Sequence, residues 1–215
     1  STQAKTLFPY TTLFRSANPS PVQPVYTTIF DAGSSGTRLS FYKVIPGNGG
    51  YPQINKLYEM EFNDNGINDF LNGNGTIELT DKKGNNTLPG GVRPANCVGG
   101  TYESNGKQQM ITNLGESDVS PCVLAPLLES QDIALAANGL THSQVKTELF
   151  ATAGMRTEDT RNGGSHSTLE IAKYYQSMKS YVAGMGFATG EFKTINGNGE
   201  EGVWTWTNLN DYYYN

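Results

Sequence analysis

The first third of the chain alternates apolar and polar residues, a pattern that predicts β-strands. Three strands are expected, over Val25–Phe30, Leu39–Val44 and Gln53–Phe62. The segment between the first two strands contains two glycines and two serines, which are typical of tight turns. The sequence therefore predicts three consecutive strands whose first connection is short.

The second half of the chain places apolar residues at helical spacing, separated by short β-like runs. A helix is expected from Ser120 to Leu140, and Pro126 predicts that it starts late or is kinked. Ser167–Gly184 predicts an amphipathic helix, which either Ser165 or Ser167 can cap. Glu170 follows Ser167 at the spacing of a capping box. The other expected elements are strands over Val145–Thr152 and Phe187–Ile195 and a helix from Gly202 onward.

A Gly- and Asn-rich insertion is expected at about residues 63–119, with two short β-like pieces at Thr76–Thr80 and Gln108–Ile111. A connection of this length normally has a small structure of its own. Around it the element order is β-β-β-α-β-α-β-α, which predicts an α/β fold with a mixed sheet flanked by helices. This order is that of the actin-like/ribonuclease-H-like ATPase half-domain, which we assign to residues 25–215.

Composition limits the classes of partner. The net charge is −5 and Lys and Arg form no cluster in the sequence, which argues against nucleic acid or an anionic membrane as the main partner. No apolar run approaches 18 residues, so no membrane span is expected. The two cysteines, Cys97 and Cys122, are either one disulfide of an exported protein or two unpaired thiols, and we favour the disulfide.

The turn between the first two expected strands has the sequence Asp31-Ala-Gly-Ser-Ser-Gly-Thr-Arg38. Its glycines allow backbone N–H groups to line a concavity that suits phosphate oxygens, and its hydroxyls add donors. A carboxylate at the end of the strand, Asp31, can hold a hydrated divalent cation beside the phosphate. An ordinary hairpin turn uses the same residue types, so this motif alone leaves both interpretations open.

Two further motifs favour the phosphate site. Ala151-Thr-Ala-Gly-Met-Arg156 follows a strand-like run, and Gly199-Glu-Glu-Gly-Val-Trp-Thr-Trp206 is followed by Asn210. In order and spacing, the three motifs resemble the first three apyrase-conserved regions of the nucleoside triphosphate diphosphohydrolase family, also called apyrases or nucleoside diphosphatases. The hexapeptide is the most specific of the three, and the resemblance extends from about Val25 to the end.

This resemblance implies a metal-dependent hydrolase that releases the terminal phosphate of nucleoside di- or triphosphates by attack of water. It implies that Glu201 is the base and that Thr152 faces the terminal phosphate and the attacking water. Asp31 would hold Mg²⁺ or Ca²⁺ through water. We expect a structural role for Arg156. The implied phosphate-binding residues are Gly33, Ser34, Ser35, Gly36, Thr37, Ala153 and Gly154.

The chain departs from the family at three points. Gly36 stands where animal ecto-enzymes often have His, Asp211 replaces the aromatic residue that usually follows Asn210, and the family's second phosphate loop is absent. We therefore expect the chain to be an N-terminal lobe that is inactive or nearly so by itself. Thr6–Ser16 resembles a translated sequencing adapter, so residues 1–24 are expected to be an artefact followed by a linker.

Three alternatives remain open at this point: another actin-fold phosphotransferase, an exopolyphosphatase-like enzyme, or a non-catalytic exported binding module. The family and the two cysteines together predict a secreted or periplasmic protein.

Overall fold

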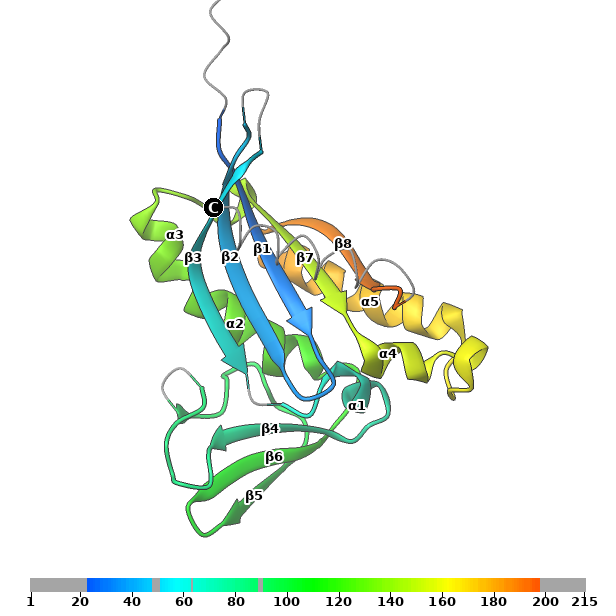
Figure 1. Ribbon diagram of the computed structural model, residues 1–215. Coiled ribbons are helices and arrows are strands. Elements are labelled where there is room, and N and C mark those ends of the chain that lie inside the picture. Colours follow the sequence, from blue (N-terminus) through cyan, green and yellow to red (C-terminus); the bar gives the residue numbers. More distant parts are fainter. Residues whose placement is uncertain (1–22, 48–50, 63, 89–90, 198–215) are drawn as a thin grey trace, which may run out of the picture.

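A computed structural model describes residues 23–47, 51–62, 64–88 and 91–197. Its centre is a five-stranded mixed sheet in the order β3-β2-β1-β7-β8 (Figure 1). The first three strands are antiparallel neighbours, and β7 and β8 continue the sheet in parallel with β1. The five strands are β1 (Val25–Ala32), β2 (Thr37–Ile45), β3 (Gln53–Phe62), β7 (Val145–Ala151) and β8 (Ala188–Thr194).

This topology confirms the expected α/β fold. β1 and β2 are joined directly through the short turn at residues 33–36, with Ala32 opposite Thr37. β1 then pairs with β7, and the partners Tyr26 and Val145 lie far apart in the sequence. Because β1 and β7 are parallel, the segments that follow them emerge at the same edge of the sheet.

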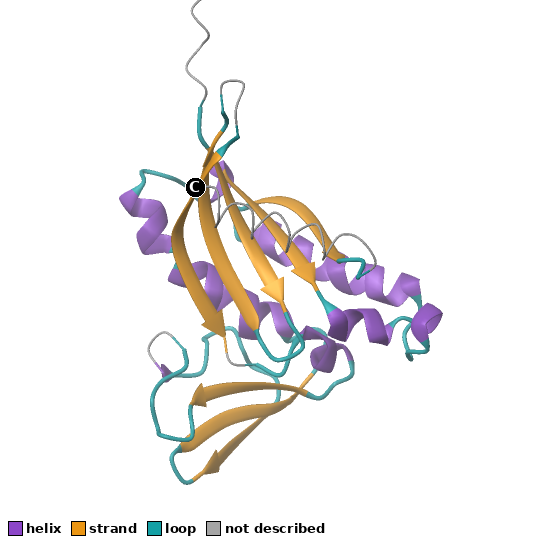
Figure 2. Ribbon diagram, in the orientation of Figure 1, coloured by secondary structure: helices purple, strands orange, loops and turns teal. Residues whose placement is uncertain are grey.

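Helices pack on one face of this sheet, behind it in the view of Figure 2. A π-helical turn, η2 (Ser120–Leu124), leads into α2 (Ala125–Ser130), and α3 (Asp132–Ala137) follows. Pro126 lies in the first turn of α2, directly after the π-helical turn, so the helical run is irregular next to this proline, and it is interrupted again at Gln131. The buried Gln131 side chain accepts a hydrogen bond from Thr28 of β1 (2.9 Å).

The longest helix, α5 (Thr168–Gly184), begins as the sequence predicts. Ser167 Oγ accepts from the Glu170 backbone N–H, and the Glu170 carboxylate accepts from the Ser167 backbone N–H, which completes a capping box. The helix buries Ile171, Tyr174, Tyr175, Met178 and Val182. These side chains join the core of Phe30, Leu39, Phe41 and Leu149 from the sheet.

The expected insertion carries a second sheet, which lies below the main sheet in Figure 1. Its three antiparallel strands have the order β4-β6-β5, with β4 (Gly75–Thr80), β5 (Thr101–Asn105) and β6 (Gln108–Leu114). The short helix α1 (Ile67–Leu71) connects β3 to β4. Cys97 and Cys122 form a disulfide, which joins the insertion to η2.

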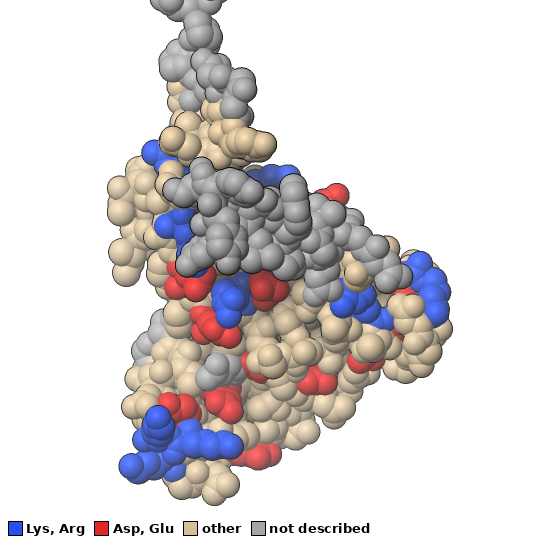
Figure 3. Space-filling view, in the orientation of Figure 1, with Lys and Arg blue, Asp and Glu red and all other residues tan. Residues whose placement is uncertain are grey.

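Charged side chains of both signs are interspersed over the face seen in Figure 3, and a positive group lies at the far end of the small sheet. Lys82, Lys83 and Lys107 are all exposed there, and Gly84 packs against the Lys107 side chain. Lys82 and Lys83 lie in one turn and Lys107 in another, so the sequence alone shows only a pair of lysines. Within the described segments, no helix is long and apolar enough to cross a membrane.

Three short helical segments connect the remaining elements. The 3₁₀ turn η3 (His142–Gln144) precedes β7, and α4 (Ala153–Glu158) follows it. A second 3₁₀ turn, η4 (Thr160–Asn162), leads toward α5. The helix expected from Gly202 onward lies outside the described residues.

Candidate functional site

The first candidate loop closes the β1–β2 hairpin. The Gly33 backbone N–H donates to the Gly36 carbonyl (2.9 Å), which closes the turn over Ser34 and Ser35. Both serine residues are exposed, while Thr37, at the start of β2, is fully buried. The loop therefore presents its two serine hydroxyls to solvent at the end of the sheet.

The second candidate loop follows β7 and lies beside the first. Ala151 pairs with Ala32 in the parallel ladder, and the Thr152 backbone N–H donates to the Ala32 carbonyl (3.2 Å). Ala153 then begins α4. The Thr152 side chain makes no capping hydrogen bond to that helix. Two motifs that are more than a hundred residues apart thus meet at one edge of the sheet.

The approach between the loops is closest at Gly154. A Cβ atom added there would lie 3.4 Å from Ser34 Cβ and 2.5 Å from Asn68 Oδ1. The second distance is shorter than real Cβ atoms show, so the absence of a side chain at this position allows α4 to pack against α1. Thr152, Ala153 and Gly154 therefore lie next to the first candidate loop.

The segment between β3 and α1 forms the floor under the first loop. A Cβ atom added to Gly66 would lie 2.8 Å from the carbonyl oxygens of both Gly33 and Ser34. Asp64 in the same segment is nine-tenths buried, and its Oδ2 accepts from Thr37 Oγ1 (2.9 Å). The Thr37 hydroxyl, expected to contact phosphate, is therefore engaged with Asp64 in this structure.

Asp31 lies at the exposed end of β1, opposite Arg38 of β2. The Arg38 guanidinium pairs with Glu61 (3.1 Å), and Glu61, Glu59 and Asp31 together raise the pKa of Arg38. No group of three or more His, Cys, Asp or Glu able to hold a metal occurs among the described residues. Asp31 is an exposed carboxylate at the edge of the first loop, and a hydrated Mg²⁺ or Ca²⁺ can be held by such a group through water.

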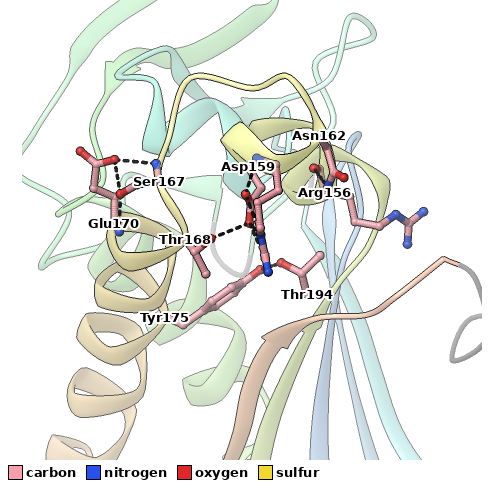
Figure 4. A network of polar contacts seen from close by, with 9 residues as sticks. Arg156, Asp159, Asn162, Ser167, Thr168, Glu170, Tyr175 and Thr194 are labelled. Atoms are coloured by element: carbon pink, nitrogen blue, oxygen red, sulfur yellow. Dashed lines mark hydrogen bonds and ion pairs between the residues drawn. The ribbon is translucent and has the colours of Figure 1, made fainter.

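The connection from α4 to α5 is fixed by a polar network (Figure 4). Asp159 accepts hydrogen bonds from the Arg161 guanidinium and from Thr168, and its partners, Arg161 above all, lower its pKa to about 2. Arg156 Nη1 donates to the Ile195 carbonyl (3.0 Å), a contact that ties α4 to the end of β8. This contact supports the structural role expected for Arg156.

A cavity of about 810 Å³ opens beside this network, between α4, α5 and β8. Arg156, Tyr175 and Phe192 are among its lining residues, and none of the candidate residues of the two loops lines it. This cavity is thus separate from the candidate residues of the two loops.

The structure brings together the candidate residues of the first two motifs, whereas Glu201 lies outside the described residues. The sequence did not indicate a role for Asp64 or Asn68 at the site, although both lie against the candidate loops. Asp64 belongs to Asp64-Asn-Gly66, which has the composition of an ordinary turn, and Asn68 follows in α1; nothing in this sequence indicates that Asp64 folds beneath a loop almost 30 residues earlier.

Comparisons with known proteins find similarity among solved structures. A scan against models of protein families finds no match, and a search of curated proteins finds none. Among solved structures, the chain is similar to part of the crystal structure of nucleoside triphosphate hydrolases from Neospora caninum. The match has a TM-score of 0.41 and 18% identity, and it covers 88% of this chain and 32% of that one. The chain thus spans less than half the length of that protein.

Proposed function

We propose that this chain is the phosphate-binding lobe of a nucleoside di- or triphosphate hydrolase. The observation that carries the proposal is the meeting of the two motif loops at the carboxyl ends of β1 and β7. Thr152 N–H reaches the Ala32 carbonyl, and Gly154 approaches Ser34. An ordinary hairpin turn would not need a second loop beside it that lacks a Cβ at the point of contact.

In this proposal the terminal phosphate lies over the first loop. The backbone N–H groups of residues 34–36 and the exposed Ser34 and Ser35 hydroxyls donate to its oxygens, and the Gly33 N–H holds the turn closed. Thr152, Ala153 and Gly154 approach the phosphate from the second loop. Thr37 supports the loop from below. Asp31 orients a hydrated Mg²⁺ or Ca²⁺, which when bound neutralises charge on the phosphate oxygens.

Hydrolysis also needs a base that orients the attacking water. We assign this role to Glu201 on its motif, Gly-Glu-Glu-Gly followed by two Trp residues. A carboxylate is ionised at neutral pH and can accept a proton from water without a large shift in pKa. Export to the periplasm or outside the cell is part of the same proposal, and the Cys97–Cys122 disulfide supports it.

Equilibrium binding of the β,γ-methylene analogue of ATP, measured by titration calorimetry with and without Mg²⁺, tests this function. We expect the chain to bind the analogue and Mg²⁺ to strengthen binding about tenfold or more. Asp31→Asn should remove most of the Mg²⁺ effect. Asp81→Asn, which makes the same change of charge at the far turn of the small sheet, should leave it intact. Absence of binding by the unmodified chain would overturn the proposal.

A further inference from the structure

Asp64 is an unusual residue for the floor of an anion-binding loop. Its side chain is almost fully buried directly under Gly36, since a Cβ atom added to Gly36 would lie 3.4 Å from Asp64 Oδ1. No lysine or arginine of the described segments forms an ion pair with it. A negative charge at this position would repel an anion bound to the loop above.

The two carboxyl oxygens of Asp64 differ in their surroundings. Oδ2 accepts from the Thr37 hydroxyl, whereas Oδ1 is buried and has no hydrogen-bond partner among the residues that the structure describes. The backbone N–H groups of Gly66 and Thr37 lie close to the carboxylate, and Tyr174 of α5 is the titratable side chain near it. The Tyr174 hydroxyl donates to the Ile67 carbonyl (2.8 Å) and so is not directed at Asp64.

These contacts stabilise the ionised carboxylate only in part. Burial raises the pKa of Asp64 to about 7, and the hydrogen bonds from Thr37 and from the backbone limit that rise. A small change in the charge above the loop is then enough to change its protonation near neutral pH.

We propose that Asp64 is a positioning residue of the first loop and that its Oδ1 takes up a proton from solvent when the phosphate binds. The proposal rests on the proposed phosphate site. The proton removes the repulsion between carboxylate and phosphate, and Thr37 continues to donate to Oδ2. Binding and protonation favour one another, so affinity falls as the pH rises through the pKa of Asp64.

The test measures how the binding affinity for the complex of Mg²⁺ with the β,γ-methylene analogue of ATP depends on pH. This complex keeps a net negative charge. Between pH 6 and 9 we expect the affinity of the unmodified chain to fall up to about tenfold more than that of Asp64→Asn. Calorimetry at pH 7.5 in HEPES and in Tris should show roughly half a proton more taken up by the unmodified chain than by the variant. Protons gained or lost by the analogue itself are the same for both proteins, so they cancel in the difference between the unmodified chain and the variant.

A second pair of variants separates this role from a purely structural one. Thr37→Val removes a hydrogen bond that favours the ionised form, so the midpoint of the fall in affinity should move to higher pH. Thr37→Ser keeps the hydroxyl and should restore the original midpoint. Asp81→Asn again controls for the loss of one charge.

The outcomes are distinct. If the unmodified chain binds the analogue but Asp64→Asn has the same pH profile and the same proton uptake, the role of Asp64 is refuted while the phosphate site stands. If Asp64→Asn fails to fold, Thr37→Val decides. An unchanged midpoint in its fall of affinity with pH then refutes the role of Asp64. If the unmodified chain does not bind, both proposals fail.

Discussion

Gly154 occupies the narrowest point between the two candidate loops. Its missing side chain leaves room for Asn68 of α1, whose Oδ1 would lie 2.5 Å from an added Cβ. A methyl group here must displace Asn68 or α4, because packed interiors accommodate added atoms only by shifting their neighbours. The position of the second loop relative to the first therefore depends on this single residue.

Gly154→Ala tests that dependence. We expect the variant to bind the Mg²⁺–analogue complex about tenfold more weakly or worse, since overpacking typically costs 1–3 kcal/mol. Gly184→Ala is the matched control, because a Cβ atom at Gly184 meets nothing within 4 Å. Equal affinities for Gly154→Ala and the unmodified chain would show that the spacing of the loops does not matter for binding.

At the scale of elements, His142 joins three parts of the chain. Its Nε2 lies 2.9 Å from Asp132 of α3, its Nδ1 lies 2.9 Å from the Met185 carbonyl after α5, and its ring stacks on Phe187. Both ring nitrogens face acceptors, and only the protonated ring can donate to both. Burial lowers the pKa of His142, but the Met185 carbonyl and the Asp132 carboxylate outweigh burial and raise it.

This arrangement predicts a pH-dependent contribution to stability. Because the pKa is raised in the folded chain, the contribution is complete below the unfolded pKa of about 6.5 and is lost as the pH rises through the folded pKa. We expect His142→Gln to lower the free energy of unfolding more at pH 5.5 than at pH 8.5, as measured by urea denaturation. A loss in His142→Gln that does not vary with pH would contradict the prediction.

The sequence predicts elements well where local chemistry determines them. Ser167 and Glu170 define the start of α5, and the alternation from Gln53 to Phe62 gives the bounds of β3. β5 was missed because all its residues are exposed, so it shows no apolar alternation. The break at Gln131 could not be predicted either, since it depends on a hydrogen bond to Thr28, about a hundred residues earlier.

The same distinction applies to the candidate site. The hexapeptide and the glycine loop made Ser34, Thr152 and Gly154 candidates from the sequence, and their role in phosphate binding stays a prediction. Asp64 and Asn68 were not candidates, because their importance comes only from the close approach of α1 to both loops. Local sequence thus indicated the loops, and tertiary packing supplied their supports.

At the scale of the whole molecule, the disulfide ties the insertion to the helical layer. Cys97 and Cys122 are 25 residues apart, and their bond encloses β5 and β6. We expect the double variant Cys97→Ala/Cys122→Ala to lose about 3 kcal/mol in free energy of unfolding, mainly because the unfolded chain gains freedom. Reduction of the unmodified chain should give a similar loss in urea denaturation and no further loss in the variant. Equal stability of the oxidised and reduced chain would contradict this prediction.

The parallel pairing of β1 with β7 also determines when the two candidate loops come together during folding. Thr27 and Lys146, hydrogen-bonded neighbours in these strands, are separated by 119 residues. Contacts of such long range are slow to form, because the entropy of closing the intervening chain must be lost first. During synthesis the first candidate loop emerges early, but the second loop can join it only after the whole insertion has been made. A nucleotide that needs both loops would then select completed chains and stabilise them against unfolding.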